Sequence, residues 1–299
     1  MLPSPYGEAR RLGYFRVLME EAIRRGPIDM DTFLLRVVER TKRMHGDLQA
    51  YVRSTGMMET IPVARNYSRF ADSLELIKIE SGQISATGPT IFFAHQNPSS
   101  NLFLLSKDER LAYFFYLWAK SPGLREIMSS FNPSGTTSVK VLRGKLPDEH
   151  LAETYTEWLV DLGLVKPTGK ARGTFYLIDQ GHRIGKVKDQ AMAASIFASY
   201  ALTEEVEVGL SLPSDLIWES VTTGSDALSP EIRRGFDRSI ISAMPVLLQV
   251  QIDIVKRHRR FFTIERLLDL CRKSAKEYGA TFKWDPIYRS GYIRFKRSG

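Results

Sequence analysis

The chain has 299 residues, of which 43% are hydrophobic and 25% are charged, proportions of ordinary globular proteins that exclude a fibrous repeat and a globally disordered chain. Its length predicts two or three domains. The formal net charge is +8, and all of the excess lies in the segment from Lys256 to Gly299, where thirteen Lys or Arg residues stand against four acids.

The sequence lacks membrane and secretion signals. No stretch approaches the roughly 20 apolar residues that span a bilayer, and the first residues have no apolar signal-peptide core. We therefore expect a cytoplasmic protein with no membrane partner. The single cysteine, Cys271, lies in a helical pattern with three leucines, so we expect a buried, unreactive thiol.

Two segments align without gaps at a spacing of 88 residues, ARNYSRFADSLELIK at 64–78 and AETYTEWLVDLGLVK at 152–166. Their shared hydrophobic positions fall three or four residues apart, as on a helix with one buried face. The aromatic pairs among them are Tyr67 with Tyr155 and Phe70 with Trp158. Each segment continues into a short strand, a turn with glycine and a second strand, which predicts a helix followed by a two-stranded hairpin.

The second of these helices ends in Leu162-Gly163-Leu164-Val165, and its hairpin ends in Tyr176-Leu177-Ile178-Asp179-Gln180-Gly181. These residues resemble the winged helix-turn-helix superfamily, in which such a helix runs into a hairpin wing. In the first segment Glu75 replaces the glycine, and the last strand is shorter. The resemblance covers about 12–93 and 103–186 and implies two winged-helix units in tandem.

Other elements follow from local signals. Ser106 to Glu109 has the spacing of a capping box and opens a helix. After Asp189 we expect longer helices at about 190–210, at 213–222, and from Ser229-Pro230 to Arg257 with a kink or break at Pro245. The end of the chain predicts a helix capped by Thr263 and a basic hairpin within 281–297.

The predicted fold class is mainly α with small β-hairpin wings. We expect winged-helix units at 1–96 and 102–188 and a helical C-terminal domain at 189–299. The last helix and hairpin form either a third winged-helix unit or the cap of an unrelated helical domain.

The basic C-terminal region is the main candidate for a nucleic-acid surface. Winged-helix proteins that bind duplex DNA place the helix before the wing in the major groove and the wing on phosphates. Interleaved aromatic residues, Trp284, Tyr288 and Tyr292, suit stacking on bases. The predicted contacts are Lys256, Arg257, Arg259, Arg260, Arg266, Lys273, Lys276, Lys283, Arg289, Arg294, Lys296 and Arg297. The alternative is a basic end that serves solubility or binds an acidic protein.

The first unit offers a second, smaller nucleic-acid surface. Arg65, Asn66 and Arg69 lie on the outward face of its helix before the hairpin. Two Arg residues four positions apart beside Asn can reach base edges or phosphates. The other interpretation is a solvated face in which the Arg residues pair with nearby acids such as Asp72.

The equivalent helix of the second unit carries carboxylates on its outward face, and these would repel phosphate. We expect this face to contact a protein partner or another domain of the chain. Its acids are Glu149, Glu153, Glu157 and Asp161.

The sequence has no nucleotide-binding loop or nucleophile elbow, and its five histidines and one cysteine have no zinc-binding spacing. We therefore predict no enzyme, no cofactor and no metal. The first hypothesis is a protein that binds nucleic acid, chiefly double-stranded DNA, as a regulator or as a component of replication, repair or defence. The alternative is a protein-interaction scaffold in a larger assembly, with a protein partner or a second copy of the chain.

Overall fold

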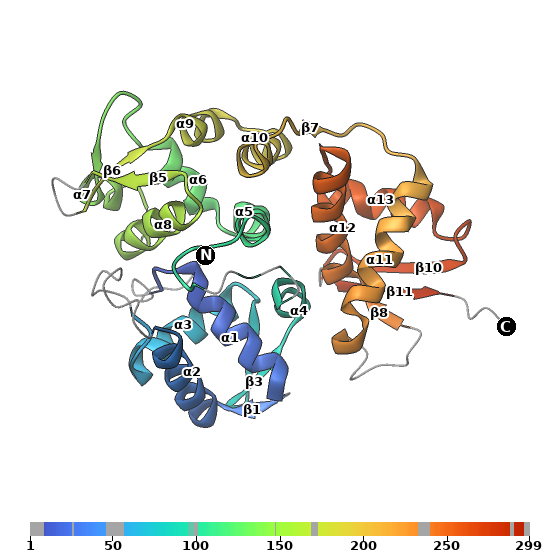
Figure 1. The fold of residues 1–299 in the computed structure, drawn as a ribbon, viewed down its shortest axis with the longest axis horizontal. Coiled ribbons are helices and arrows are strands. Elements are labelled where there is room, and N and C mark those ends of the chain that lie inside the picture. Colours follow the sequence, from blue (N-terminus) through green and yellow to red (C-terminus); the bar gives the residue numbers. More distant parts are fainter. Residues whose placement is uncertain are drawn as a thin grey trace.

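The computed structural model describes residues 9–25, 27–45, 57–94, 96, 98, 101–146, 148–168, 173–232, 240–287 and 290–295, with the backbone alone at 227–232. The described chain is mainly helical with small antiparallel sheets, as the sequence predicts. Figure 1 shows it as three lobes, with the C-terminal lobe beside the other two.

The N-terminal lobe has one three-stranded sheet. Its strands lie in the order β1-β3-β2, with all pairs antiparallel. Its elements are α1 (Leu12–Arg25), β1 (Ile28–Asp29), α2 (Met30–His45), α3 (Ile61–Ser73), β2 (Ile77–Glu80), β3 (Gln83–Ala86) and α4 (Gly88–Ala94).

The central lobe has the same kind of sheet, in the order β4-β6-β5. Its elements are α5 (Lys107–Lys120), α6 (Pro122–Ser129), β4 (Thr137–Ser138), α7 (Val139–Arg143), α8 (Glu149–Asp161), β5 (Val165–Pro167), β6 (Thr174–Leu177), α9 (Asp179–Lys186) and α10 (Gln190–Leu202).

The C-terminal lobe repeats this sheet in the order β8-β11-β10. A short parallel pair, β7 with β9, ties it to the segment that follows α10. Its elements are β7 (Glu207–Val208), α11 (Ser214–Ile232), β8 (Ile240–Ser242), α12 (Ala243–His258), β9 (Arg260–Phe261), α13 (Ile264–Ser274), β10 (Ala280–Asp285) and β11 (Ser290–Phe295).

One arrangement therefore recurs in all three lobes of the described chain: a strand, two helices and a hairpin, with the first strand paired to the last. The first two copies show the repeat seen in the sequence, because α3 and α8 begin and end 88 residues apart. The aligned residues Phe70 and Trp158 contact each other, with ring centroids 5.3 Å apart. The two lobes thus pack through equivalent faces.

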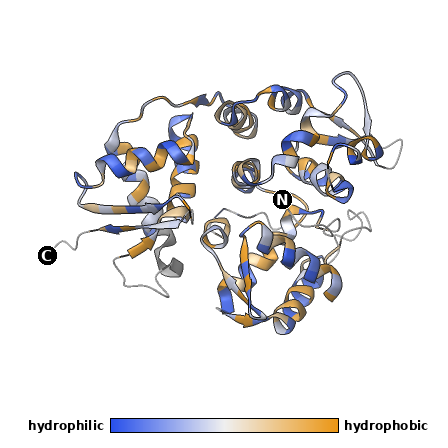
Figure 2. Cartoon of the chain, turned by 180° about the vertical axis from the view of Figure 1, so that it is seen from behind, coloured by the Kyte–Doolittle hydropathy of each residue, from blue (hydrophilic) through white to orange (hydrophobic). Residues whose placement is uncertain are grey.

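Hydrophobic side chains gather in two core clusters, and Figure 2 shows hydrophobic and hydrophilic stretches alternating along the helices that build them. The larger cluster continues from the N-terminal lobe into the central lobe, and the smaller one fills the C-terminal lobe. Helix α12 belongs to both: Leu248 and Ile252 join the larger core, and Leu247 and Val250 join the smaller. This helix holds the C-terminal lobe against the rest of the chain.

Two predicted helix caps are confirmed. Ser106 and Glu109 form the reciprocal hydrogen bonds of a capping box at the start of α5. The Thr263 hydroxyl accepts a hydrogen bond from the Arg266 amide at the start of α13.

The predicted helix from Ser229-Pro230 to Arg257 is wrong. Helix α11 runs on to Ile232, residues 240–242 form strand β8, and α12 begins only at Ala243. Pro245 neither kinks nor splits α12, because it lies in the first turn, where no amide donor is needed. The helix predicted for 190–210 also ends early, at Leu202, and is followed by β7.

Candidate nucleic-acid interface

Helix α13 has one apolar face and one basic face. Leu267, Leu268 and Cys271 are buried in the core of the C-terminal lobe. Two of the predicted cations, Lys273 and Lys276, are exposed, and so is Arg272, which the prediction omitted. Arg272 and Lys273 lie in the last turn of α13, and Lys276 lies in the turn that follows the helix. Arg272 directly precedes Lys273 in the sequence, and that was the signal for including it.

The hairpin that follows α13 adds cations to the lobe. Phe282 and Ile293 face the core, and they are directly opposite each other in the strand register. Side chains alternate between the two faces of a sheet. Lys283, paired in register with Tyr292, and Arg294 therefore lie on the outer face, where both cations are exposed.

The basic run at 256–260 has partners within the chain. Its side chains, at the end of α12, pair with acidic residues on α5, on α11 and in the segment after α10. The ion pairs are Lys256–Asp108 (3.0 Å), Arg257–Glu219 (3.6 Å) and Arg259–Glu204 (2.5 Å). The hydrogen bond from Arg259 lowers the pKa of Glu204. This run therefore joins elements of the fold and contributes less free charge than the sequence indicates.

Two neighbouring arginines bind backbone carbonyls. Arg260 donates to the Ser211 carbonyl at 3.0 Å, and Arg266 donates to the Leu210 carbonyl at 3.1 Å.

Lys273 pairs with Asp269 at 2.9 Å, one turn earlier on α13, and lowers the pKa of that carboxyl group. Exposed ion pairs of this kind contribute only about 0–1 kcal/mol, so phosphate can compete for such a cation.

The remaining predicted residues of the basic end fall into two groups. Trp284 is half-buried and lines a cavity, so its ring is not an open platform for a base. Tyr288, Arg289, Lys296 and Arg297 lie outside the described residues.

In the N-terminal lobe, the predicted trio lies on α3 as expected. Arg69 is exposed, and Asn66 is half-buried. Arg65 pairs with Asp31 at 3.3 Å. Asp72, the acid suggested from the sequence, instead accepts a hydrogen bond from the Ile79 amide at 2.8 Å. This small surface keeps one exposed cation.

The acidic helix α8 is covered by the start of the described chain. Glu153 pairs with Arg10 at 2.6 Å, and Asp161 pairs with Arg11 at 2.7 Å. Asp161 also accepts a hydrogen bond from the Leu12 amide at 2.8 Å. Glu157 lies 3.9 Å from Arg11, Arg143 is a second partner of Glu153, and Glu149 is exposed. The contact expected for this helix is thus made within the chain.

Burial raises the pKa of Asp161 to about 7, against the opposing effects of Arg11 and the Leu12 amide. Cys271 is buried, as predicted, and burial likewise raises the pKa of its thiol to about 12. Among the described residues, no three His, Cys, Asp or Glu side chains are placed to hold a metal ion. Within the same residues, no helix has the length and apolar character needed to cross a bilayer.

Comparison of the chain with protein-family models, with curated proteins and with solved structures finds no match. The function is therefore inferred from the arrangement of the lobes and from the surface of α13 and its hairpin.

Proposed function

We propose that this chain is a non-enzymatic nucleic-acid-binding protein built from three winged helix-turn-helix units, with its DNA-binding surface on the C-terminal unit. The recurring order of strand, two helices and hairpin supports this assignment, because each lobe then has a helix directly before a hairpin wing. The signature at Leu162-Gly163-Leu164-Val165 supports it for the central lobe.

A single observation carries the choice of surface. Of the three helices that precede a hairpin, α13 exposes Arg272 and Lys273, and Lys276 is exposed in the turn directly after it. Helix α8 instead has its carboxylates against residues 10–12 and its Trp158 indole bonded to the Ala9 carbonyl at 2.9 Å. A helix that enters a DNA groove needs exposed cations to contact the phosphates. Of the three helices that precede a hairpin, α13 fits this requirement.

The alternative remains an interaction scaffold whose basic end binds an acidic protein or RNA. The carboxylates of α8 give it little added support as a docking face for a separate protein, because three of the four have partners within this chain. Double-stranded DNA is accordingly the first ligand to test.

The test is the fluorescence anisotropy of a labelled DNA duplex at low and at moderate salt. We expect binding that weakens steeply with salt, because each phosphate contact releases a counterion. Arg272→Glu combined with Lys276→Glu should weaken binding at least about tenfold.

The control variant, Arg24→Glu with Arg25→Glu, makes the same change in net charge at exposed residues of α1. It should reduce the affinity much less. No binding by the wild-type chain at low salt, or equal losses in the two variants, would overturn the proposal.

A further inference from the structure

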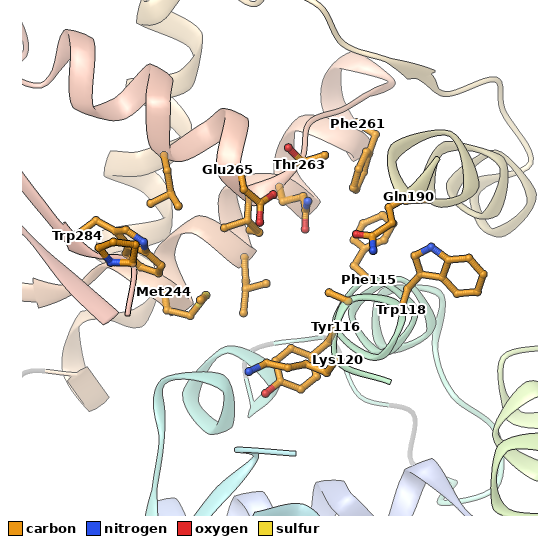
Figure 3. A pocket seen from close by; sticks show the side chains of 17 residues that line it. Phe115, Tyr116, Trp118, Lys120, Gln190, Met244, Phe261, Thr263, Glu265 and Trp284 are labelled. Atoms are coloured by element: carbon orange, nitrogen blue, oxygen red, sulfur yellow. The ribbon is translucent and has the colours of Figure 1, made fainter. Parts of the chain in front are cut away.

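The first turn of α13 faces the central lobe. Thr263, Ile264 and Glu265 line a cavity of about 260 Å³, whose other walls include residues of α5 and α10. Figure 3 shows Thr263 and Glu265 on one side of this space, with Tyr116 and Lys120 of α5 on the other. Ile264 also packs against both hydrophobic cores. A DNA duplex, with a major groove about 12 Å wide, does not fit into this space.

The next cation of α13 is also bound within the chain. The Arg266 guanidinium donates to the Leu210 carbonyl at 3.1 Å and lies 3.7 Å from the Asp269 carboxylate. In helix-turn-helix proteins, the N-terminal residues of the recognition helix contact the base edges. In this chain that end of the helix contacts other parts of the chain, and it carries two acids, Glu265 and Asp269, that repel phosphate.

The helix and hairpin of this unit lack the amide side chains that read adenine. Adenine is read by Asn or Gln, which form two hydrogen bonds to one base. The segment 264–295, from the start of α13 to the end of β11, contains no Asn and no Gln. The hydroxyl of Ser274, in the last turn of α13, already donates to the Leu270 carbonyl and accepts from the Trp218 indole at 2.8 Å. Base reading by this helix therefore has little to depend on.

The opposite end of α13 carries the exposed cations. Arg272 and Lys273 lie in its last turn, and Lys276 lies in the turn after it. The chain then turns at Gly279, which has φ of 65°, and enters β10. The register of the hairpin pairs Arg294 with the second residue after Gly279. Cations therefore gather where α13 ends and the hairpin begins.

The other two helices before a hairpin offer little for reading bases. On α3, Arg65 is paired with Asp31 and Asn66 is half-buried, so Arg69 is the exposed cation of the predicted trio. On α8, the carboxylates lie against residues 10–12.

We infer that the chain binds the phosphate backbone of duplex DNA and does not read its base sequence. The end of α13 and the adjoining hairpin contact the phosphates, while the start of α13 packs towards the central lobe. Phosphate contacts position a protein on the duplex but carry no sequence information directly. This inference rests on the proposed function and narrows it, because the partner becomes a duplex of any sequence.

The first test changes chemical groups on the DNA. Fluorescence anisotropy with the full chain compares one duplex with the same duplex containing 7-deazapurines, which lack the N7 acceptor of the major groove and keep every phosphate. We expect the two affinities, and that for a scrambled duplex of the same length and composition, to agree within about threefold. Methylphosphonate linkages remove the phosphate charge and should weaken binding at least about tenfold.

The second test separates the two ends of α13 with matched substitutions. Each phosphate contact contributes about −0.9 to the slope of log affinity against log salt concentration. Arg272→Ala should reduce the size of this slope by about 0.9 and weaken binding to every duplex by the same factor. Arg266→Ala makes the same change near the start of the same helix and should leave the slope as in wild type.

A loss of more than about threefold on the 7-deazapurine or scrambled duplex would overturn this inference and leave the proposed function standing. Equal changes in slope from Arg266→Ala and Arg272→Ala would do the same, because the start of α13 would then contact DNA. Absence of binding to any duplex at low salt would overturn the proposed function, and this inference with it.

Discussion

Residue 163 and its counterpart 75 in the repeat share a left-handed backbone, with φ of 78° at Gly163 and 58° at Glu75. Glu75 stands where the second copy of the repeat has glycine, and the turn keeps its conformation despite this difference. The glycine in the second copy of the repeat therefore indicated a left-handed backbone at this turn. The sequence did not predict that glutamate in the first copy keeps the same backbone conformation.

We expect Gly163→Ala to lower the free energy of unfolding by about 1–2 kcal/mol, since a Cβ is disfavoured at positive φ. A Cβ at this position would otherwise meet only ordinary contacts, at 3.4 Å. Gly144→Ala is the control, because Gly144 has φ of −70° and open space around it. It should raise stability by about 0.4–1 kcal/mol. Urea denaturation measures both, and equal effects would contradict the backbone argument.

Asp161 should make part of the stability depend on pH. Its pKa is raised from 3.8 to about 7, so the folded chain holds this proton more tightly than the unfolded chain does. The contribution of the protonated Asp161 to the free energy of unfolding is therefore fully present below about pH 4. It is lost as the pH rises to about 7, at up to about 1.4 kcal/mol per pH unit.

Asp161→Asn removes this titration. Relative to wild type, the variant should gain stability as the pH rises from about 4 to about 7. Thermal denaturation across this pH range, compared between the two proteins, measures the difference. A difference that stays constant with pH would show that Asp161 is ionised throughout.

At the scale of elements, α1 and α5 are joined by a buried ion pair. Arg16 and Glu109 lie 2.6 Å apart, and their side chains are 6% and 3% exposed. Glu109 also accepts the Ser106 amide in the capping box. Removing one partner of a buried pair leaves the other charge without compensation.

Arg16→Met should therefore destabilise the chain by about 3–5 kcal/mol. Arg43→Met removes the ion pair between Arg43 and Glu39, two side chains that are 72% and 70% exposed. This substitution should lower the free energy of unfolding by less than about 1 kcal/mol. Chemical denaturation of the two variants gives the comparison. Similar small losses would mean that the Arg16 contact contributes little to the docking of α5.

Local patterns predict the elements of this chain where the signal is strong. The repeat located α3 and α8, and the Ser106 and Thr263 caps located the starts of α5 and α13. Strand β8 escaped prediction because Ile240 and Ile241 fit a helical stripe as well as a short strand. Its pairing with β11, about fifty residues later, decides between the two.

At the scale of the whole molecule, the candidate site was predicted in part. The sequence located the excess of positive charge and the alternation of the hairpin. It could not show that Asp108, Glu204 and Glu219 pair with the basic run, since these acids are distant along the chain. For the same reason, it left open what covers α8. The winged-helix assignment and the three domain ranges stay predictions.

Contact between the C-terminal unit and nucleic acid can be located by photocross-linking a bromodeoxyuridine-containing duplex to the full chain, followed by mass spectrometry of the attached peptides. We predict cross-links within 264–295, on α13 and its hairpin, and none on α8. Cross-links concentrated on α3 or α8, or none anywhere at low salt, would contradict the account.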